Sequence, residues 1–150
     1  MSLVDYLLQV SSAQAVTTTT TSTYSIDLSQ PRDLGPGNDL YAMFTVDTTA
    51  AGVGASVTFQ VISSASASLS SPTVLSDIPS IPVADLLAGR RPISLPIPQA
   101  NLSAQALGQR YLGVQYTVNS GPLTAGAFSC AFVADTPSQN TYYPSGFTVA

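Results

Sequence analysis

The chain has 150 residues, of which only 8% are charged, and its eight Asp and four Arg give a formal net charge of −4. A chain of this length suits one domain, which buries about 68–70% of its extended surface without help from disulfides or metals. His, Lys, Glu and Trp are absent. Acid–base catalysis usually needs His, Glu or Lys, zinc sites need His or several Cys, and phosphate contacts need clustered Lys or Arg. We therefore expect no enzyme, no cofactor and no nucleic-acid partner.

The low charge also bears on how the strand edges are protected. Natural sheets commonly guard their edges with Lys, which this chain lacks. The edges are therefore either covered within the fold or occupied by protein partners. The single cysteine, Cys130, lies in an apolar pattern and is expected to act as a small buried hydrophobe. No stretch is long and apolar enough for a membrane span, and Leu3–Val10 lacks the basic flank of a signal peptide.

Residues 1–23 read as an N-terminal arm or a lead-in strand, and residues 24–150 as one domain. Asp5–Leu8 is compatible with a short helix or a strand, whereas Thr17–Thr21 favours extended backbone because Thr is stiff at χ1. Tyr24–Leu28 alternates as a strand does. Gln30–Asp39 is a turn region whose acidic and amide spacing does not match a calcium loop.

Two one-faced strands follow. Leu40–Val46 places apolar residues on one face and partly apolar residues on the other, which predicts a central strand. Thr48–Gly54 reads as a loop, and Val57–Val61 as the second strand. Beyond the turn at Ser70–Pro72, prolines confine the segments to edges and connections. Val83–Gly89 suggests one helical turn, and Ile93–Ile97 an edge strand.

The clearest pattern runs from Arg110 to Asp135. On its first arm Leu112, Val114, Tyr116 and Val118 share one face, and on its second arm Phe128, Cys130 and Phe132 do. Because Asn119–Pro122 between the arms is a cluster of turn residues, this stretch predicts a β-hairpin with one buried face. Seven to eight short strands and no long helix together predict an all-β, jelly-roll-like antiparallel β-sandwich with extended N- and C-terminal arms.

Seven blocks spread along nearly the whole chain carry a resemblance to a known family. They are Ser12–Thr17, Ile26–Leu28, Arg32–Gly35, Gly37–Tyr41, Leu69–Thr73, Arg110–Tyr116 and Leu123–Phe128. With these blocks the chain resembles the capsid cement (decoration) proteins of tailed bacteriophages, in particular the family typified by the cement protein of a Bordetella phage. The proline-rich middle, Ile78–Leu107, is the least similar part.

The resemblance implies a jelly-roll sandwich on the exterior of an assembled icosahedral capsid, made in the host bacterial cytoplasm and incorporated into the virion. There it would bridge neighbouring major capsid protein subunits as a homodimer or homotrimer. The family has no catalytic residues to carry over to this chain.

Aromatic and Arg side chains dominate the energetics of interfaces, which is why we expect capsid contacts at three places. The expected contact residues are Tyr6, Leu7 and Leu8 near the start, the pair Arg90 and Arg91, and Tyr142 and Tyr143 near the end. A solvated loop is the simpler reading of the Arg pair. Closure of the core is an equally simple reading of the Tyr pair.

Two other functions are open to this sequence. A carbohydrate-binding or adhesive β-sandwich module would use Tyr6, Tyr24, Tyr41 or Tyr111 as a sugar platform, although Trp is missing. A hydrolase with paired carboxylates would use residues such as Asp33 and Asp39. The Asp residues are scattered mainly in turns, which makes the second alternative remote.

Overall fold

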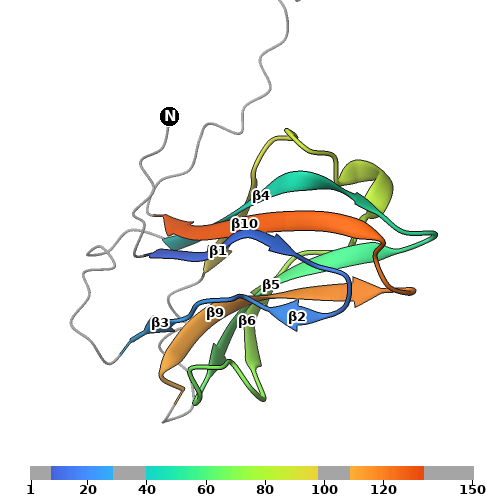
Figure 1. Ribbon diagram of the computed structural model, residues 1–150. Coiled ribbons are helices and arrows are strands. Elements are labelled where there is room, and N and C mark those ends of the chain that lie inside the picture. The colour runs from blue at the N-terminus through green and yellow to red at the C-terminus, as the bar shows by residue number, and fades with distance from the viewer. Residues whose placement is uncertain (1–7, 29–39, 98–108, 134–150) are drawn as a thin grey trace, which may run out of the picture.

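The computed structural model describes residues 8–28, 40–97 and 109–133. Within them the chain is built of strands that form two antiparallel sheets packed face to face, without an α-helix (Figure 1). The elements are β1 (Gln9–Ala15), β2 (Thr20–Thr21), β3 (Ile26–Asp27), β4 (Leu40–Ala51), β5 (Ser56–Ser64), β6 (Thr73–Asp77), β7 (Ile81–Pro82), the 3-10 turn η2 (Val83–Asp85), β8 (Ile93–Ile97), β9 (Tyr111–Asn119) and β10 (Ala125–Val133).

The strand order in each sheet identifies the topology. The first sheet runs β1-β10-β4-β8, and the second runs β2-β9-β5-β6, with β3 added to β9 and β7 added to β5. If the two-residue strands β3 and β7 are left out, strands that are consecutive in the chain lie in opposite sheets. The exception is β5 and β6, which pair with each other in the second sheet. This alternation is the arrangement of a jelly roll, in which two Greek keys are wrapped into a double sheet. The predicted all-β, jelly-roll-like sandwich is confirmed.

Four aromatic rings fill the space between the sheets. Phe44 and Phe128 come from the first sheet and Phe59 and Tyr116 from the second, and the ring centroids of the five contacting pairs lie 5.0 to 6.1 Å apart. Each ring is at an inward position of a strand whose side chains alternate between core and surface. Edge-to-face and offset pairs of this kind add about 0.5–1.5 kcal/mol each beyond the area that they bury.

The predicted hairpin between Arg110 and Asp135 is wrong. Both strands exist and their buried faces are as predicted, but β9 pairs with β5 in the second sheet and β10 pairs with β4 in the first. The connection crosses the sandwich instead of turning within one sheet. Leu123, which is buried, anchors it, and its backbone N–H donates to Thr17 O at 2.7 Å. The two apolar faces therefore oppose each other across the core.

The predictions for several other segments can be compared with the structure. β4 is central in its sheet and β8 is an edge strand, as expected. The predicted loop Thr48–Gly54 is shorter, because β4 continues to Ala51 through its pairing with Ala125. The predicted helical turn at Val83–Gly89 is present only as η2. Within the predicted arm or lead-in strand of residues 1–23, the described part forms β1 and β2, which belong to different sheets.

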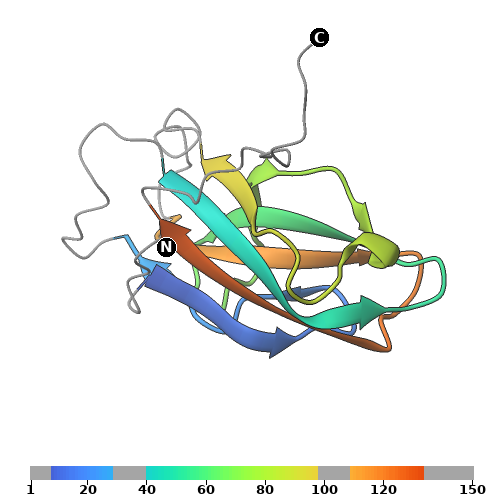
Figure 2. The same ribbon diagram turned by 90° about the horizontal axis from the view of Figure 1, so that it is seen from above.

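The sandwich has two unlike ends (Figure 2). At one end, which we call the junction end, strand pairing brings together the starts of β1, β4 and β9 and the ends of β3, β8 and β10. At the opposite end, which we call the loop end, the described connections 16–19, 52–55, 83–92 and 120–124 meet through backbone hydrogen bonds.

Candidate functional site

The predicted contact residues that the structure describes lie at opposite ends of the sandwich. Leu8 lies at the junction end, partly buried against the core. Arg90 and Arg91 lie in the connection that forms part of the loop end; Arg90 is half-buried and Arg91 is exposed. Tyr6, Leu7, Tyr142 and Tyr143 lie outside the described residues, as do Asp33 and Asp39. The structure thus does not bring Leu8 and the Arg pair together, and their capsid contacts stay predictions.

Arg90 has a structural role in its own loop. Its guanidinium Nη1 donates to the backbone carbonyl of Asp85 at 2.6 Å, and its backbone N–H donates to Leu87 O at 3.2 Å. The two bonds satisfy the carbonyl of Asp85, the last residue of the short η2 turn, and that of Leu87 just beyond it. Arg90 therefore shapes the loop that presents Leu87 and Arg91.

Hydrogen bonds link the two sheets at both lateral edges of the sandwich. On one side Ser76 of β6 donates its hydroxyl to Pro96 O of β8 at 3.0 Å. On the other side the Gln14 amide donates to Thr21 O at 2.8 Å and accepts from the Thr23 N–H at 3.0 Å. Open edges invite pairing with another chain. These bonds occupy edge groups that Lys protects in other proteins, so the edges are at least partly covered within the fold.

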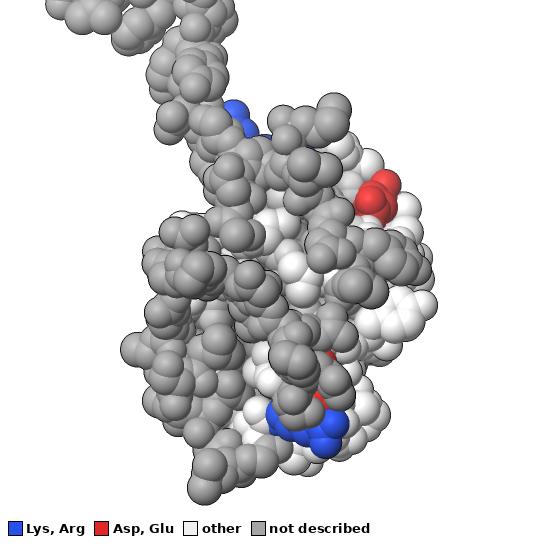
Figure 3. Space-filling view, turned by 90° about the vertical axis from the view of Figure 1, so that its left-hand side faces the viewer, with Lys and Arg blue, Asp and Glu red and all other residues white. Residues whose placement is uncertain are grey.

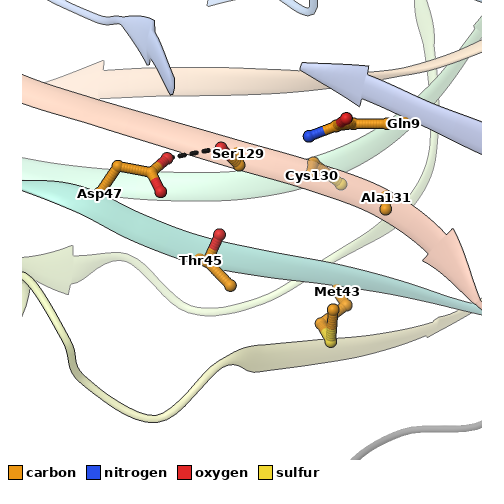
Figure 4. Close-up of a pocket in the computed structure, with 7 residues that line it drawn as sticks. All are labelled: Gln9, Met43, Thr45, Asp47, Ser129, Cys130 and Ala131. Atoms are coloured by element: carbon orange, nitrogen blue, oxygen red, sulfur yellow. Dashed lines mark hydrogen bonds between the residues drawn. The ribbon is translucent and has the colours of Figure 1, made fainter. Parts of the chain in front are cut away.

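An open hollow lies on the outer face of the first sheet (Figure 4). Its volume is about 410 Å³, and its lining comes from β1, β4 and β10. The lining residues are Gln9, Met43, Thr45, Asp47, Ser129, Cys130 and Ala131. Sequence reasoning missed this site, although the outward alternation of Thr45 and Asp47 on β4 was a usable signal.

Hydrogen bonds hold Ser129 and Asp47 in place in the hollow. Ser129 donates its hydroxyl to Asp47 Oδ2 at 2.5 Å and accepts the Ala13 N–H at 2.8 Å (Figure 4). A nucleophilic serine usually relies on an adjacent His as its general base, and the chain contains no His. The arrangement instead positions a carboxylate and a hydroxyl that can accept or donate hydrogen bonds at the surface.

The junction end carries a charged cluster built on β3 and β9. The Arg110 guanidinium donates from Nε to Asp27 Oδ1 at 2.8 Å and from Nη2 to Asp27 Oδ2 at 2.6 Å, and it lies 5.3 Å from the centre of the Tyr111 ring. The carboxylate raises the pKa of Arg110 through its hydrogen bonds and its charge. Figure 3, which faces this end, shows charge in a few small patches on a described surface that is otherwise mostly white.

The described tyrosines of the predicted sugar platform do not share one face. Tyr24 is exposed, whereas Tyr41 and Tyr111 are partly buried. Tyr41 alternates with inward residues of β4 in the first sheet, and Tyr111 with inward residues of β9 in the second. These two rings are therefore on opposite outer faces of the sandwich and cannot contact one small sugar together.

Two ionisable groups are buried in the core. Burial raises the pKa of the Cys130 thiol and the pKa of the Tyr116 hydroxyl well above their ordinary values. Cys130 is thus a buried hydrophobe, as expected, because its reactive thiolate form is disfavoured. Among the described residues no group of three or more His, Cys, Asp or Glu could hold a metal ion. The described ranges also contain no helix with the length and hydropathy of a membrane span.

Comparison with known proteins identifies the family. No curated protein matches the chain. The family model Bbp16 matches residues 10–133, which include all the strands described above except the first residue of β1. The chain therefore belongs to the Bbp16 family, a family of Bordetella phage proteins, and is a phage structural protein.

Proposed function

We propose that this protein is a capsid cement protein. It binds the exterior of an assembled icosahedral phage capsid and bridges neighbouring major capsid protein subunits, so that the shell is harder to disrupt. The observation that carries the proposal is the match of residues 10–133 to the Bbp16 family, together with the family resemblance of the sequence blocks. The protein acts as a homodimer or homotrimer, without catalysis and without binding nucleic acid or membrane.

Binding energy alone supplies the stabilisation. A ligand that binds only the assembled shell stabilises it by RT ln(1 + [L]/Kd) per site, which is about 2.7 kcal/mol when the free protein is at 100 times Kd. Each copy that spans two subunits must be released before they separate. Repetition over many equivalent sites makes a modest affinity per contact sufficient.

The build of the sandwich supports this role. Hydrogen bonds across both lateral edges, such as Ser76 to Pro96 O, disfavour strand addition between copies. Free protein can therefore accumulate without polymerising through its edges until shells are available. A surface with few charges suits burial against another protein, because less charge has to be desolvated.

The proposed function is tested by the stability of shells that lack the protein. Purified shells are heated with and without added protein, and release of the packaged genome is followed by a fluorescent dye. We expect release at a higher temperature when the protein is present, with an effect that saturates as its concentration rises. Equal release temperatures at saturating protein would refute the cement role.

The Arg pair offers a finer test of the predicted contacts. Arg91→Ala should weaken binding to shells more at low salt than at high salt, because screening already reduces the attraction at high salt. Arg90→Ala also removes the bond to Asp85 O that shapes the loop, so the thermal unfolding of both variants is measured beside their binding. Binding by Arg91→Ala that equals wild type at low salt would remove Arg91 from the interface.

A further inference from the structure

We propose that the loop end docks onto the shell, with the side chains of Val53 and Leu87 seated against an apolar, weakly charged patch of the major capsid protein. This inference rests on the proposed function and names the surface that carries it out. The two side chains are among the four large apolar side chains that the described part of the chain leaves exposed. They differ from the other two, Tyr24 and Val74, in lying on the connections of the loop end.

Val53 lies in the short connection between β4 and β5. This connection projects furthest from the sandwich at the loop end (Figures 1 and 2). Its side chain is fully exposed, at 101%. Gly54 has φ +67°, and a Cβ at Gly52 would lie 3.2 Å from both Ala55 Cβ and Pro122 O. Turn tips favour Gly, Asn, Asp and Ser, and a β-branched residue brings no benefit to folding there. The exposed valine thus lies between Gly54, at a positive φ, and Gly52, where a side chain would have little space.

Leu87 is the second exposed side chain, at 53%, next to the fully buried Leu86. The backbone around it is fixed to β4, because the Ala50 N–H donates to Leu86 O at 2.9 Å and the Ala88 N–H donates to Thr49 Oγ1 at 2.9 Å. Leu86 thus anchors the loop in the core while Leu87 faces outward.

The connections of the loop end hold one another in place. Backbone N–H groups of Leu123 and Thr124 donate to Thr17 O at 2.7 Å and to Ala51 O at 2.8 Å, and the Val83 N–H donates to Ala55 O at 3.2 Å. A surface that is already ordered loses little conformational entropy on binding, so more of the contact energy appears as affinity. The loop end is therefore preorganised for binding a partner.

The chemistry of the loop end selects the kind of partner. Connections 16–19, 52–55 and 120–124 contain no charged residue, and the charges of connection 83–92 are Asp85, Arg90 and Arg91. A nearby hollow of about 480 Å³ is lined by Thr18, Thr19, Val118, Gly121 and Pro122, again without charge. Such a surface complements an apolar patch with neutral polar groups, and it offers little to a polyanion such as DNA. Given the proposed function, the partner with such a patch is the capsid protein.

The test uses Val53→Asp, Leu87→Asp and the double variant in the full-length protein, titrated onto purified shells. Asp suits a turn tip, so Val53→Asp should fold, and thermal unfolding of each variant checks this. The matched control is Val74→Asp on β6, where an equally large side chain is 45% exposed away from the loop end. We expect each loop-end variant to bind about tenfold or more weakly, because the new Asp would bury an unpaired carboxylate against the apolar patch, and the control to bind within about twofold of wild type.

The outcomes separate this inference from the proposed function. If wild type fails to bind shells, the proposed function is refuted. If wild type binds and the loop-end variants bind equally well, only the docking surface is refuted. The same variants are examined by sedimentation without shells. If they dissociate from a wild-type oligomer while still binding shells, the loop end is an interface between copies of this chain, which also overturns the inference.

Discussion

The hydroxyl oxygen of Tyr116 on β9 lies 2.5 Å from the hydroxyl oxygen of Ser11 on β1, so one hydrogen bond joins the two sheets through the core. Both residues are fully buried. Tyr116 also contacts Phe44, Phe59 and Phe128, which makes it the member of the aromatic cluster with a polar link to the opposite sheet. The two residues are 105 positions apart in the chain.

Tyr116→Phe should therefore destabilise the protein by more than the loss of one oxygen suggests. It leaves the buried Ser11 hydroxyl without its partner, and an unsatisfied buried hydroxyl costs about 1–3 kcal/mol. The measurement is urea unfolding of both single variants and of Tyr116→Phe/Ser11→Ala. We expect the double variant to lose less than the sum of the single losses. Additive losses would show that the two hydroxyls do not interact.

Ser63→Ala should stabilise the protein, whereas Ser11→Ala should destabilise it. Both serines are 0% exposed, but Ser63 Oγ has no hydrogen-bond partner in the described structure. Ser63→Ala removes a buried polar group that gains nothing from the fold, so it should raise the free energy of unfolding by about 1 kcal/mol. Ser11→Ala, measured in the same urea experiment, is the matched control and should lower it. Destabilisation by Ser63→Ala would mean that its hydroxyl is bonded.

Gly113→Ala tests a close contact on the outer face of the second sheet. A Cβ at this position would overlap Leu69 Cδ1 and would lie 2.9 Å from Ser22 Oγ. Leu69 is 2% exposed, so its side chain has little room to move, and overpacking of this kind costs about 1–3 kcal/mol. The expected result is a lower unfolding temperature.

The Leu69→Ala background distinguishes this clash from a backbone effect. With Leu69 shortened, the added methyl group at Gly113 has space, and its cost should shrink or vanish. An undiminished cost of Gly113→Ala in the Leu69→Ala protein would rule out the contact with Leu69 as the cause.

Alkaline pH should unfold the protein through Cys130 and Tyr116. Burial raises both pKa values above their ordinary 9.0 and 10.0, so the folded state keeps these protons to higher pH than the unfolded chain does. Their contribution is fully present below pH 9 and falls as pH rises, by about 1.4 kcal/mol per pH unit for each group once the unfolded chain ionises.

Urea unfolding between neutral pH and about pH 11 measures this slope. The variant Cys130→Ala/Tyr116→Phe lacks both groups and should lose much less stability across the same range, whatever its stability at neutral pH. An equally steep loss in that variant would assign the alkaline transition to other residues.

The alternation of side chains predicted the strands and their buried faces, because burial of one face of a strand leaves a period of two in the sequence. Phe44 on β4, Phe59 on β5 and Phe128 on β10 all lie inward as expected. The same period cannot identify the partner of a strand. A hairpin and a connection that crosses the sandwich both bury one face of each arm, so alternation alone does not show whether β9 and β10 lie in one sheet or in two.

The candidate sites depend on contacts between distant parts of the chain, which a local pattern does not contain. Asp27 and Arg110 are 83 positions apart, and so are brought together only by the pairing of β3 with β9. Asp47 and Ser129 meet in the same way through β4 and β10. Val53, in contrast, has a local signal in the sequence, namely a valine between two glycines in a predicted loop.

The most direct test of the cement role is a titration of the purified protein onto closed, genome-filled shells that lack it, with bound copies counted after sedimentation. Closed shells expose only their exterior, and dissociated capsid subunits serve as the control. We predict saturable binding, at a fixed number of copies per shell, to assembled shells and not to free subunits. Absence of binding, or binding that rises without saturation, would contradict a cement protein on the capsid exterior.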